Sequence, residues 1–110
     1  MKNDIVKCLK VAVCICAKDG VISEAEEVMM FKIVSYKCPE FLIEDFEQVL
    51  DGYFDSDDQI EDYLNQINSK ELREFTLELS EKSASADGLD LRENIALSKA
   101  YTYWGIKPHE

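Results

Sequence analysis

The chain has 110 residues, 46% of them hydrophobic and 32% charged, and its formal net charge is -11. This length fits one domain, residues 1–110, and the composition is too apolar for a disordered tail and too charged for a membrane protein. Because so negative a surface repels phosphate backbones, we expect no nucleic-acid partner, and cations or basic proteins fit better.

The first predicted helix runs from about Asp4 to Ala17 and is apolar over nearly all of its second half. This pattern predicts a central position in the fold. The apolar run is too short to span a bilayer. Lys7 and Lys10 interrupt the apolar stretch that a signal peptide would need. We therefore expect a cytoplasmic protein without membrane insertion. The cysteines show neither zinc-site nor redox spacing and are predicted to be reduced core residues: Cys8, Cys14, Cys16 and Cys38.

Five more helices are predicted from capping signals and apolar stripes of helical spacing. Their starting signals are Ser23 with Glu26, Pro39, Ser56, Ser69, and Asp90 with Glu93. The second helix is predicted to end at about Tyr36, the third at Asp51-Gly52 and the fifth at about Ala86. The sixth is predicted to end at about Trp104, with Gly105 as its C-cap. The short fourth helix carries Ile60, Tyr63, Leu64 and Ile67. The inward stripe of the third helix is predicted to be Leu42, Phe46, Val49, Leu50 and Tyr53. No segment alternates with period two for long, so the sequence predicts an all-α, single compact bundle of about six short helices.

The most informative feature of the sequence is a repeated Asp-Gly turn. Residues 17–26 read AKDGVISEAE, and residues 85–93 read SADGLDLRE. With one residue dropped after Gly88, each unit contains a helix end, an Asp-Gly turn, an apolar anchor, an N-cap and a glutamate in the first turn of the next helix. The sequence therefore predicts a pseudo-symmetric pair of helix–Asp-Gly–helix units.

Each unit has a structural and a metal-binding interpretation. Glu26 and Glu93 can satisfy a free backbone N–H at a helix start, and Asp19 and Asp87 can form turns before a glycine of positive φ. The same carboxylates can instead ligate Ca²⁺, Mg²⁺ or Mn²⁺ if the bundle brings its two ends together. Ser23 and Glu24 are nearby supporting oxygens, and the candidate metal ligands are Asp19, Glu26, Asp87, Asp90 and Glu93.

An EF-hand is not expected at either unit. Residues 19–26 match the second half of an EF-hand calcium loop position by position. In the first half, Ile15 and Ala17 stand where acidic residues are needed. The acidic run at residues 55–58 also fails, because Ile60 occupies the glycine position.

The whole arrangement resembles the TerB-like family, known from tellurite-resistance proteins and from the N-terminal part of some membrane-anchored J-domain co-chaperones. The resemblance rests on the two quoted segments and on the final helix ending Tyr103-Trp104-Gly105-Ile106. In that family an Ala-x-Asp-Gly-x-Ile-x-x-x-Glu-like motif occurs twice in a pseudo-symmetric helical bundle. The resemblance implies an acidic surface that binds a divalent cation, carried here by Asp19, Glu26, Asp87 and Glu93, and a role in a stress-response or membrane-associated complex. The missing residue after Gly88 shifts Glu93 relative to Asp87, which is a departure from the motif.

A non-catalytic binding module is the function that the sequence favours. The single histidine, His109, is the penultimate residue, and neither a phosphate-binding loop nor a thiolate–histidine zinc set occurs in the sequence. One hypothesis is cation binding at the two turns, and the alternative is a metal-free domain whose acidic face docks an unknown partner that is basic or membrane-associated. The charge also fits plain solubility. Some of the large apolar side chains of the helices can line a groove for a partner. These side chains include Met29, Met30, Phe31, Tyr36, Phe41 and Phe54.

Overall fold

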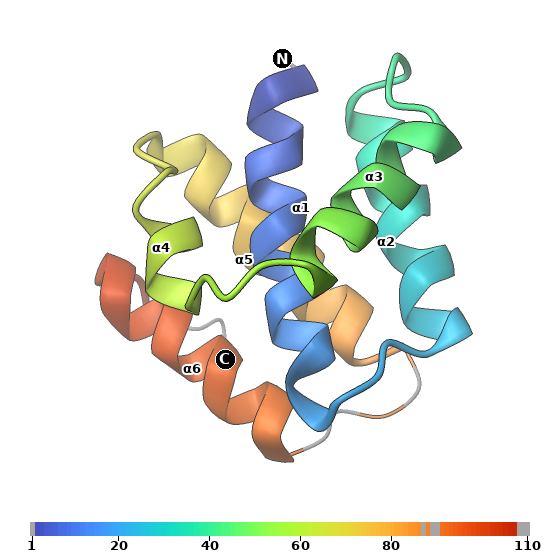
Figure 1. The fold of residues 1–110 in the computed structure, drawn as a ribbon. Coiled ribbons are helices and arrows are strands. Elements are labelled where there is room, and N and C mark those ends of the chain that lie inside the picture. The colour runs from blue at the N-terminus through green and yellow to red at the C-terminus, as the bar shows by residue number, and fades with distance from the viewer. Residues whose placement is uncertain (1, 87, 89–90, 108–110) are drawn as a thin grey trace.

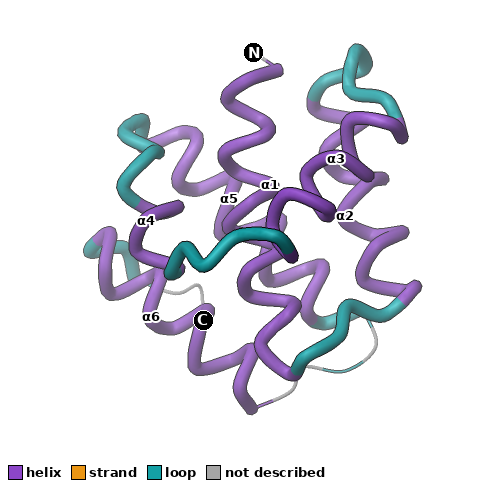
Figure 2. Tube along the Cα trace, in the orientation of Figure 1, coloured by secondary structure: helices purple, strands orange, loops and turns teal. Residues whose placement is uncertain are grey.

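The computed structural model describes residues 2–86, 88 and 91–107. Their elements, in chain order, are α1 (Lys2–Cys16), the 3-10 turn η1 (Ala17–Asp19), α2 (Glu24–Lys37), α3 (Ile43–Phe54), α4 (Ile60–Leu64), α5 (Lys70–Ala84) and α6 (Leu91–Trp104). No strand occurs in this part of the chain, as Figure 2 shows. The prediction of an all-α fold with about six helices is confirmed.

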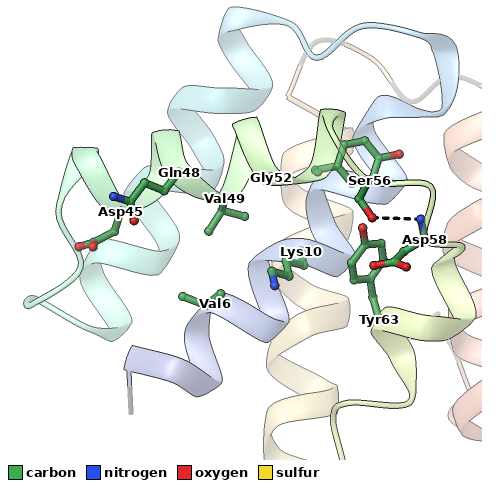
Figure 3. Close-up of a pocket in the computed structure, with 10 residues that line it drawn as sticks. Val6, Lys10, Asp45, Gln48, Val49, Gly52, Ser56, Asp58 and Tyr63 are labelled. Atoms are coloured by element: carbon green, nitrogen blue, oxygen red, sulfur yellow. Dashed lines mark hydrogen bonds between the residues drawn. The ribbon is translucent and has the colours of Figure 1, made fainter.

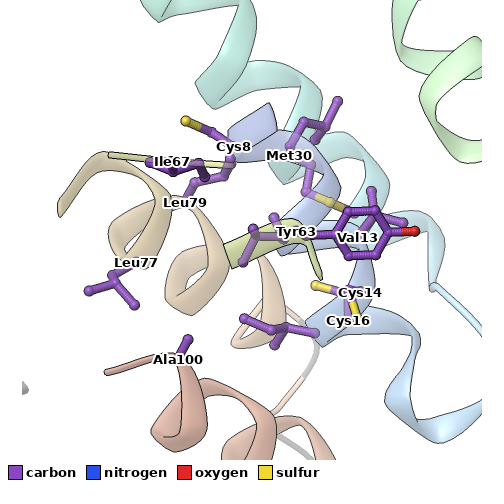
Figure 4. Packing of buried hydrophobic residues seen from close by; sticks show 14 of the residues in the cluster. Cys8, Val13, Cys14, Cys16, Met30, Tyr63, Ile67, Leu77, Leu79 and Ala100 are labelled. Atoms are coloured by element: carbon purple, nitrogen blue, oxygen red, sulfur yellow. The ribbon is translucent and has the colours of Figure 1, made fainter. Parts of the chain in front are cut away.

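The apolar helix α1 forms the centre of the fold. All of its residues from 11 to 16 are buried, and α1 packs against each of the other five α-helices (Figure 1). The four cysteines are buried thiols in the core, and Figure 4 shows Cys8, Cys14 and Cys16 among the packed side chains. The predicted central position of this helix is confirmed. No helix among the described residues is long and apolar enough to cross a membrane.

Four predicted helix boundaries, in three helices, agree closely with the structure. Ser23 caps α2 and forms the predicted capping box, and Ser69 caps α5 by accepting a hydrogen bond from the backbone N–H of Leu72. The last helix, α6, spans 91–104 as predicted, and Gly105 follows it with a φ of 66°. These boundaries depend on local capping chemistry, which is why the sequence shows them.

The predictions for the third helix were wrong at both ends. Pro39 lies in a turn, and α3 begins later because the Asp45 carboxylate accepts a hydrogen bond from the backbone N–H of Leu42 at 2.8 Å. Leu42 is therefore an exposed cap residue rather than a member of the inward stripe. Gly52 does not end the helix, since a glycine inside a helix costs only about 1 kcal/mol and the half-buried Tyr53 packs against the core.

Two further boundaries also differ from the prediction. Ser56 does not cap α4, because the Asp62 carboxylate caps it by accepting a hydrogen bond from the backbone N–H of Gln59 at 2.8 Å. Ile67 lies beyond α4 but is buried. The fifth helix ends at Ala84, two residues before the predicted end at Ala86.

The C-terminal helix is fixed to the bundle along its length. Trp104 donates its indole N–H to the backbone carbonyl of Leu64 at 3.2 Å, and the Tyr101 hydroxyl donates to the Glu81 carboxylate at 3.2 Å. Lys99 pairs with a glutamate of α4 at 3.0 Å. At its other end, α6 packs against η1 and α1 (Figure 1). The start of α6 is thus held beside the end of α1.

Candidate metal centre

The glycines of the two Asp-Gly turns adopt the same backbone conformation. Gly20 and Gly88 both have a φ of 98°, in the left-handed region that favours glycine. Each donates its N–H to a carbonyl three residues earlier, from Gly20 to Ala17 at 2.9 Å and from Gly88 to Ser85 at 3.3 Å. The next helix begins at Glu24 after Gly20 and at Leu91 after Gly88.

Glu26, the third residue of α2, is the buried carboxylate of the first unit. One of its oxygens, Oε1, accepts a hydrogen bond from the backbone N–H of Ser23 at 2.8 Å, and the Ser23 hydroxyl accepts one from the Glu26 N–H at 3.1 Å. This capping box fixes the side chain, which is only 2% exposed. Glu26 therefore caps α2 through Oε1, and its second carboxylate oxygen can make another contact.

Glu93, the third residue of α6, is the buried carboxylate of the second unit and is 1% exposed. It meets Glu26 at the end of α1, where Cys16 is the last helical residue and is fully buried. One oxygen of each carboxylate and the thiol sulfur all lie within 4.8 Å of one another. We call Cys16, Glu26 and Glu93 the thiol–carboxylate cluster.

The other predicted ligands do not enlarge this cluster in the described part of the chain. Asp87, Asp90 and the side chain of Asp19 lie outside the described residues. Glu24 is exposed and lines a groove on another side of α2. The Ser23 hydroxyl is used in the capping box. Among the described residues, the structure therefore brings together Glu26 and Glu93 from the predicted set.

Sequence reasoning missed Cys16 as a member of the site. Its apolar surroundings in α1 predicted a core residue, and that prediction holds, since the thiol is buried. The available signal was its position directly before the first Asp-Gly unit, at residues 17–26. Periodicity does not report which end of a central helix faces two incoming carboxylates, because that depends on tertiary packing.

The cluster has the donor set of a metal site. Two carboxylates that are buried side by side are costly unless a proton or a cation is shared between them. Atoms bound to one tetrahedral Zn²⁺ lie about 3.3–3.8 Å apart. The three atoms, which lie within 4.8 Å of one another, would therefore have to move closer together for one ion to contact all of them.

A separate cleft lies between α1, α3 and the segment before α4 (Figure 3). It has a volume of about 350 Å³, and its walls include the Lys10 amine and the Tyr63 hydroxyl. The Ser56 hydroxyl there accepts a hydrogen bond from the backbone N–H of Asp58 at 3.1 Å. Burial raises the pKa of Tyr63, so its hydroxyl stays protonated at neutral pH. No member of the thiol–carboxylate cluster lines this cleft.

Comparison of the chain with protein-family models, curated proteins and solved structures found no match. The resemblance to TerB-like proteins therefore stays a prediction based on the two Asp-Gly segments and the end of the last helix. The thiol–carboxylate cluster is interpreted from its own residues and their chemistry.

Proposed function

We propose that this chain is a cation-binding module that holds a divalent ion between its two Asp-Gly units. One observation carries the proposal. Glu26 and Glu93 come from opposite halves of the sequence, are both nearly fully buried, and converge on the thiol of Cys16. A divalent cation there would compensate both carboxylates and join the end of α1 to the starts of α2 and α6.

The capping box supports the proposal by orienting a ligand. The backbone N–H of Ser23 holds one oxygen of Glu26, which fixes the rotation of the carboxylate. Hydrogen bonds of this kind orient the ligands of protein metal sites and strengthen binding. The same glutamate can therefore cap a helix through one oxygen and bind an ion through the other.

The thiol changes which ion we expect. The carboxylates alone predicted Ca²⁺, Mg²⁺ or Mn²⁺, which prefer oxygen ligands. A cysteine thiolate together with carboxylates suits Zn²⁺, and Co²⁺ can replace Zn²⁺ in such sites. With Cys16 in the cluster, we propose Zn²⁺ as the preferred ion, bound more tightly than Ca²⁺ or Mg²⁺.

The proposal is consistent with the TerB-like resemblance of the two segments, which implies a pseudo-symmetric, non-catalytic, cation-binding domain in a stress-response or membrane-associated complex. We propose that setting for this chain as well. A reducing, cytoplasmic location is supported by the four buried cysteines, which form no disulfide with one another.

Thermal unfolding with and without added cations tests the proposal. At a free Zn²⁺ concentration a hundredfold above the Kd, we expect a stabilisation of about 2.7 kcal/mol. Ca²⁺ and Mg²⁺ at equal concentration should stabilise less. Glu26→Gln and Glu93→Gln should each remove the Zn²⁺ effect, because an uncharged amide binds the ion poorly but can still cap a helix.

Glu74→Gln is the matched control, since Glu74 is an exposed helical glutamate. This variant should keep the full effect of Zn²⁺. If no divalent cation stabilises the wild-type protein, or if Glu74→Gln loses the effect as fully as the two cluster variants, the proposal is wrong.

A further inference from the structure

An apolar groove lies between α2 and α3, away from the thiol–carboxylate cluster. Val28 and Ile43 are 60% and 45% exposed there, and Phe31 and Phe46 contribute their rings, whose centroids are 5.8 Å apart. Phe46 belongs to the core, and Phe31 packs against the core while partly exposed. Val28 and Ile43 therefore form the exposed part of this apolar patch, and such a patch commonly marks an interaction site.

The rim of this groove is acidic. Glu24 and Glu27 from α2 and Glu47 from α3 line it, against a single basic residue, Lys32. The whole chain has a net charge of -11, which adds to the negative potential. The groove thus combines an apolar floor with a rim that attracts positive charge.

We infer that this α2–α3 groove docks a basic amphipathic helix of a partner protein. Such a helix presents apolar side chains at i, i+3, i+4 and i+7, which can pack on the apolar side chains of the groove, and flanking lysines or arginines would face the glutamates. A second copy of this chain would place carboxylates against carboxylates, and an anionic membrane surface would be repelled. Charge complementarity thus selects a basic partner.

The inference is independent of the proposed cation site. Glu26 turns into the cluster, whereas its neighbours Glu24 and Glu27 line the groove, so one turn of α2 serves both surfaces with different residues. Loss of cation binding would leave the groove intact, and a defective groove would leave the cluster intact. The two proposals can fail separately.

The test uses a fluorescent synthetic peptide of about 18 residues, built from leucine and lysine as an amphipathic helix. Binding is measured by anisotropy at physiological salt. We expect Val28→Asp and Ile43→Asp to weaken binding by about tenfold or more each, as expected for central interface residues. Both side chains are exposed, so these variants should fold, which circular dichroism checks. Ile95→Asp, at an equally exposed site on α6, should bind like the wild type.

Charge and location provide the second arm of the test. Glu27→Lys should weaken binding of the lysine peptide, and a peptide with glutamate in place of lysine should not bind. Backbone amide shifts on peptide addition should concentrate in α2 and α3. Equal loss in the groove variants and in Ile95→Asp, or binding of the glutamate peptide, would overturn the inference. Self-association of the wild type that Val28→Asp abolishes would also overturn it, because the occupant would then be a second copy.

Discussion

The two Asp-Gly units share the φ of their glycine and a buried glutamate, although the number of residues between these two differs. In both, a glycine with a φ of 98° donates its N–H to a carbonyl three residues earlier. In both, the third residue of the following helix is a buried glutamate. Glu93, however, follows Gly88 one residue sooner than Glu26 follows Gly20. The missing residue does not keep Glu93 from meeting Glu26 and Cys16.

What is common to the two units is the position of the glutamate in its helix, not its distance from the glycine. At the third helical position, a carboxylate lies over the free N–H groups of the helix start and benefits from the helix dipole. Asp45 occupies the same position in α3 but is only partly buried. A carboxylate at the third helical position can therefore cap its helix. Glu26 and Glu93 are candidate metal ligands because packing at the end of α1 also buries them.

The largest expected effect comes from a cavity in α1, the helix whose last residue, Cys16, lies beside the glutamates of both units. Leu9 is fully buried in α1. Leu9→Ala should lower the free energy of unfolding by about 2–5 kcal/mol, because it leaves a cavity in the central helix. Urea denaturation measures the change. Leu91→Ala, at an exposed leucine of α6, should change stability by no more than about 0.5 kcal/mol.

The comparison of the two glycines is tested by Gly20→Ala and Gly88→Ala. At a φ of 98° a side chain is strained, so each variant should lose about 1–2 kcal/mol of stability. Apart from the chain neighbours, no atom of the described residues lies within 4 Å of an added Cβ at either glycine, so we expect the loss to come from backbone strain and to be similar for both. Gly52→Ala, inside α3, should instead stabilise the protein slightly. A loss at only one of the two turns would show that their conformations are not equivalent.

The capping role of Glu26 is separated from its charge by two substitutions. Glu26→Ala removes the hydrogen bond to the Ser23 backbone and should cost about 0.5–2 kcal/mol without any added cation. Glu26→Gln keeps an acceptor oxygen and should stay within about 0.5 kcal/mol of the wild type under the same conditions. Chemical denaturation in a chelator measures both. Equal losses in the two variants would mean that the charge, and not the cap, stabilises apo protein.

The smallest effect is expected at the partly buried counterpart, Asp45. The hydrogen bond from the backbone N–H of Leu42, and then Lys2, lower the pKa of this carboxyl. Because the pKa of Asp45 is lower in the folded state than in the unfolded state, its carboxylate stabilises the protein at pH values above the ordinary pKa of Asp. This stabilisation is lost as the pH falls through the lowered pKa. Asp45→Asn should therefore be slightly less stable at neutral pH and equal to the wild type in acid, as measured by thermal unfolding across the pH range.

The features that the sequence predicted correctly depend on local patterns. The burial of α1 follows from a nearly unbroken apolar run, and the bounds of α6 follow from a helical stripe ending at Gly105. The start of α3 was misplaced because the prediction relied on Pro39, whereas the Asp45 carboxylate caps the helix from within its first turn. A helix boundary with two competing signals is decided by packing, which a single sequence does not show.

The candidate site was predicted in part. Glu26 and Glu93 were identified from the repeat, because a glutamate after a capping residue has a recognisable spacing. Cys16 was not, since its role depends on which helix starts meet the end of α1. For the α2–α3 groove, the sequence predicted only that some apolar side chains could line a groove for a partner. Composition shows an excess of apolar residues, but it does not show that Val28 and Ile43 are the exposed ones.

The most direct test of the central claim is the absorption spectrum of the protein titrated with Co²⁺. If Cys16 is a ligand beside Glu26 and Glu93, the wild type should develop a thiolate-to-cobalt charge-transfer band in the near ultraviolet. Cys16→Ser should lose this band. Cys14→Ser, which changes another buried cysteine of α1, should keep it. No band in the wild type, or a band that survives Cys16→Ser and disappears in Cys14→Ser, would contradict the account.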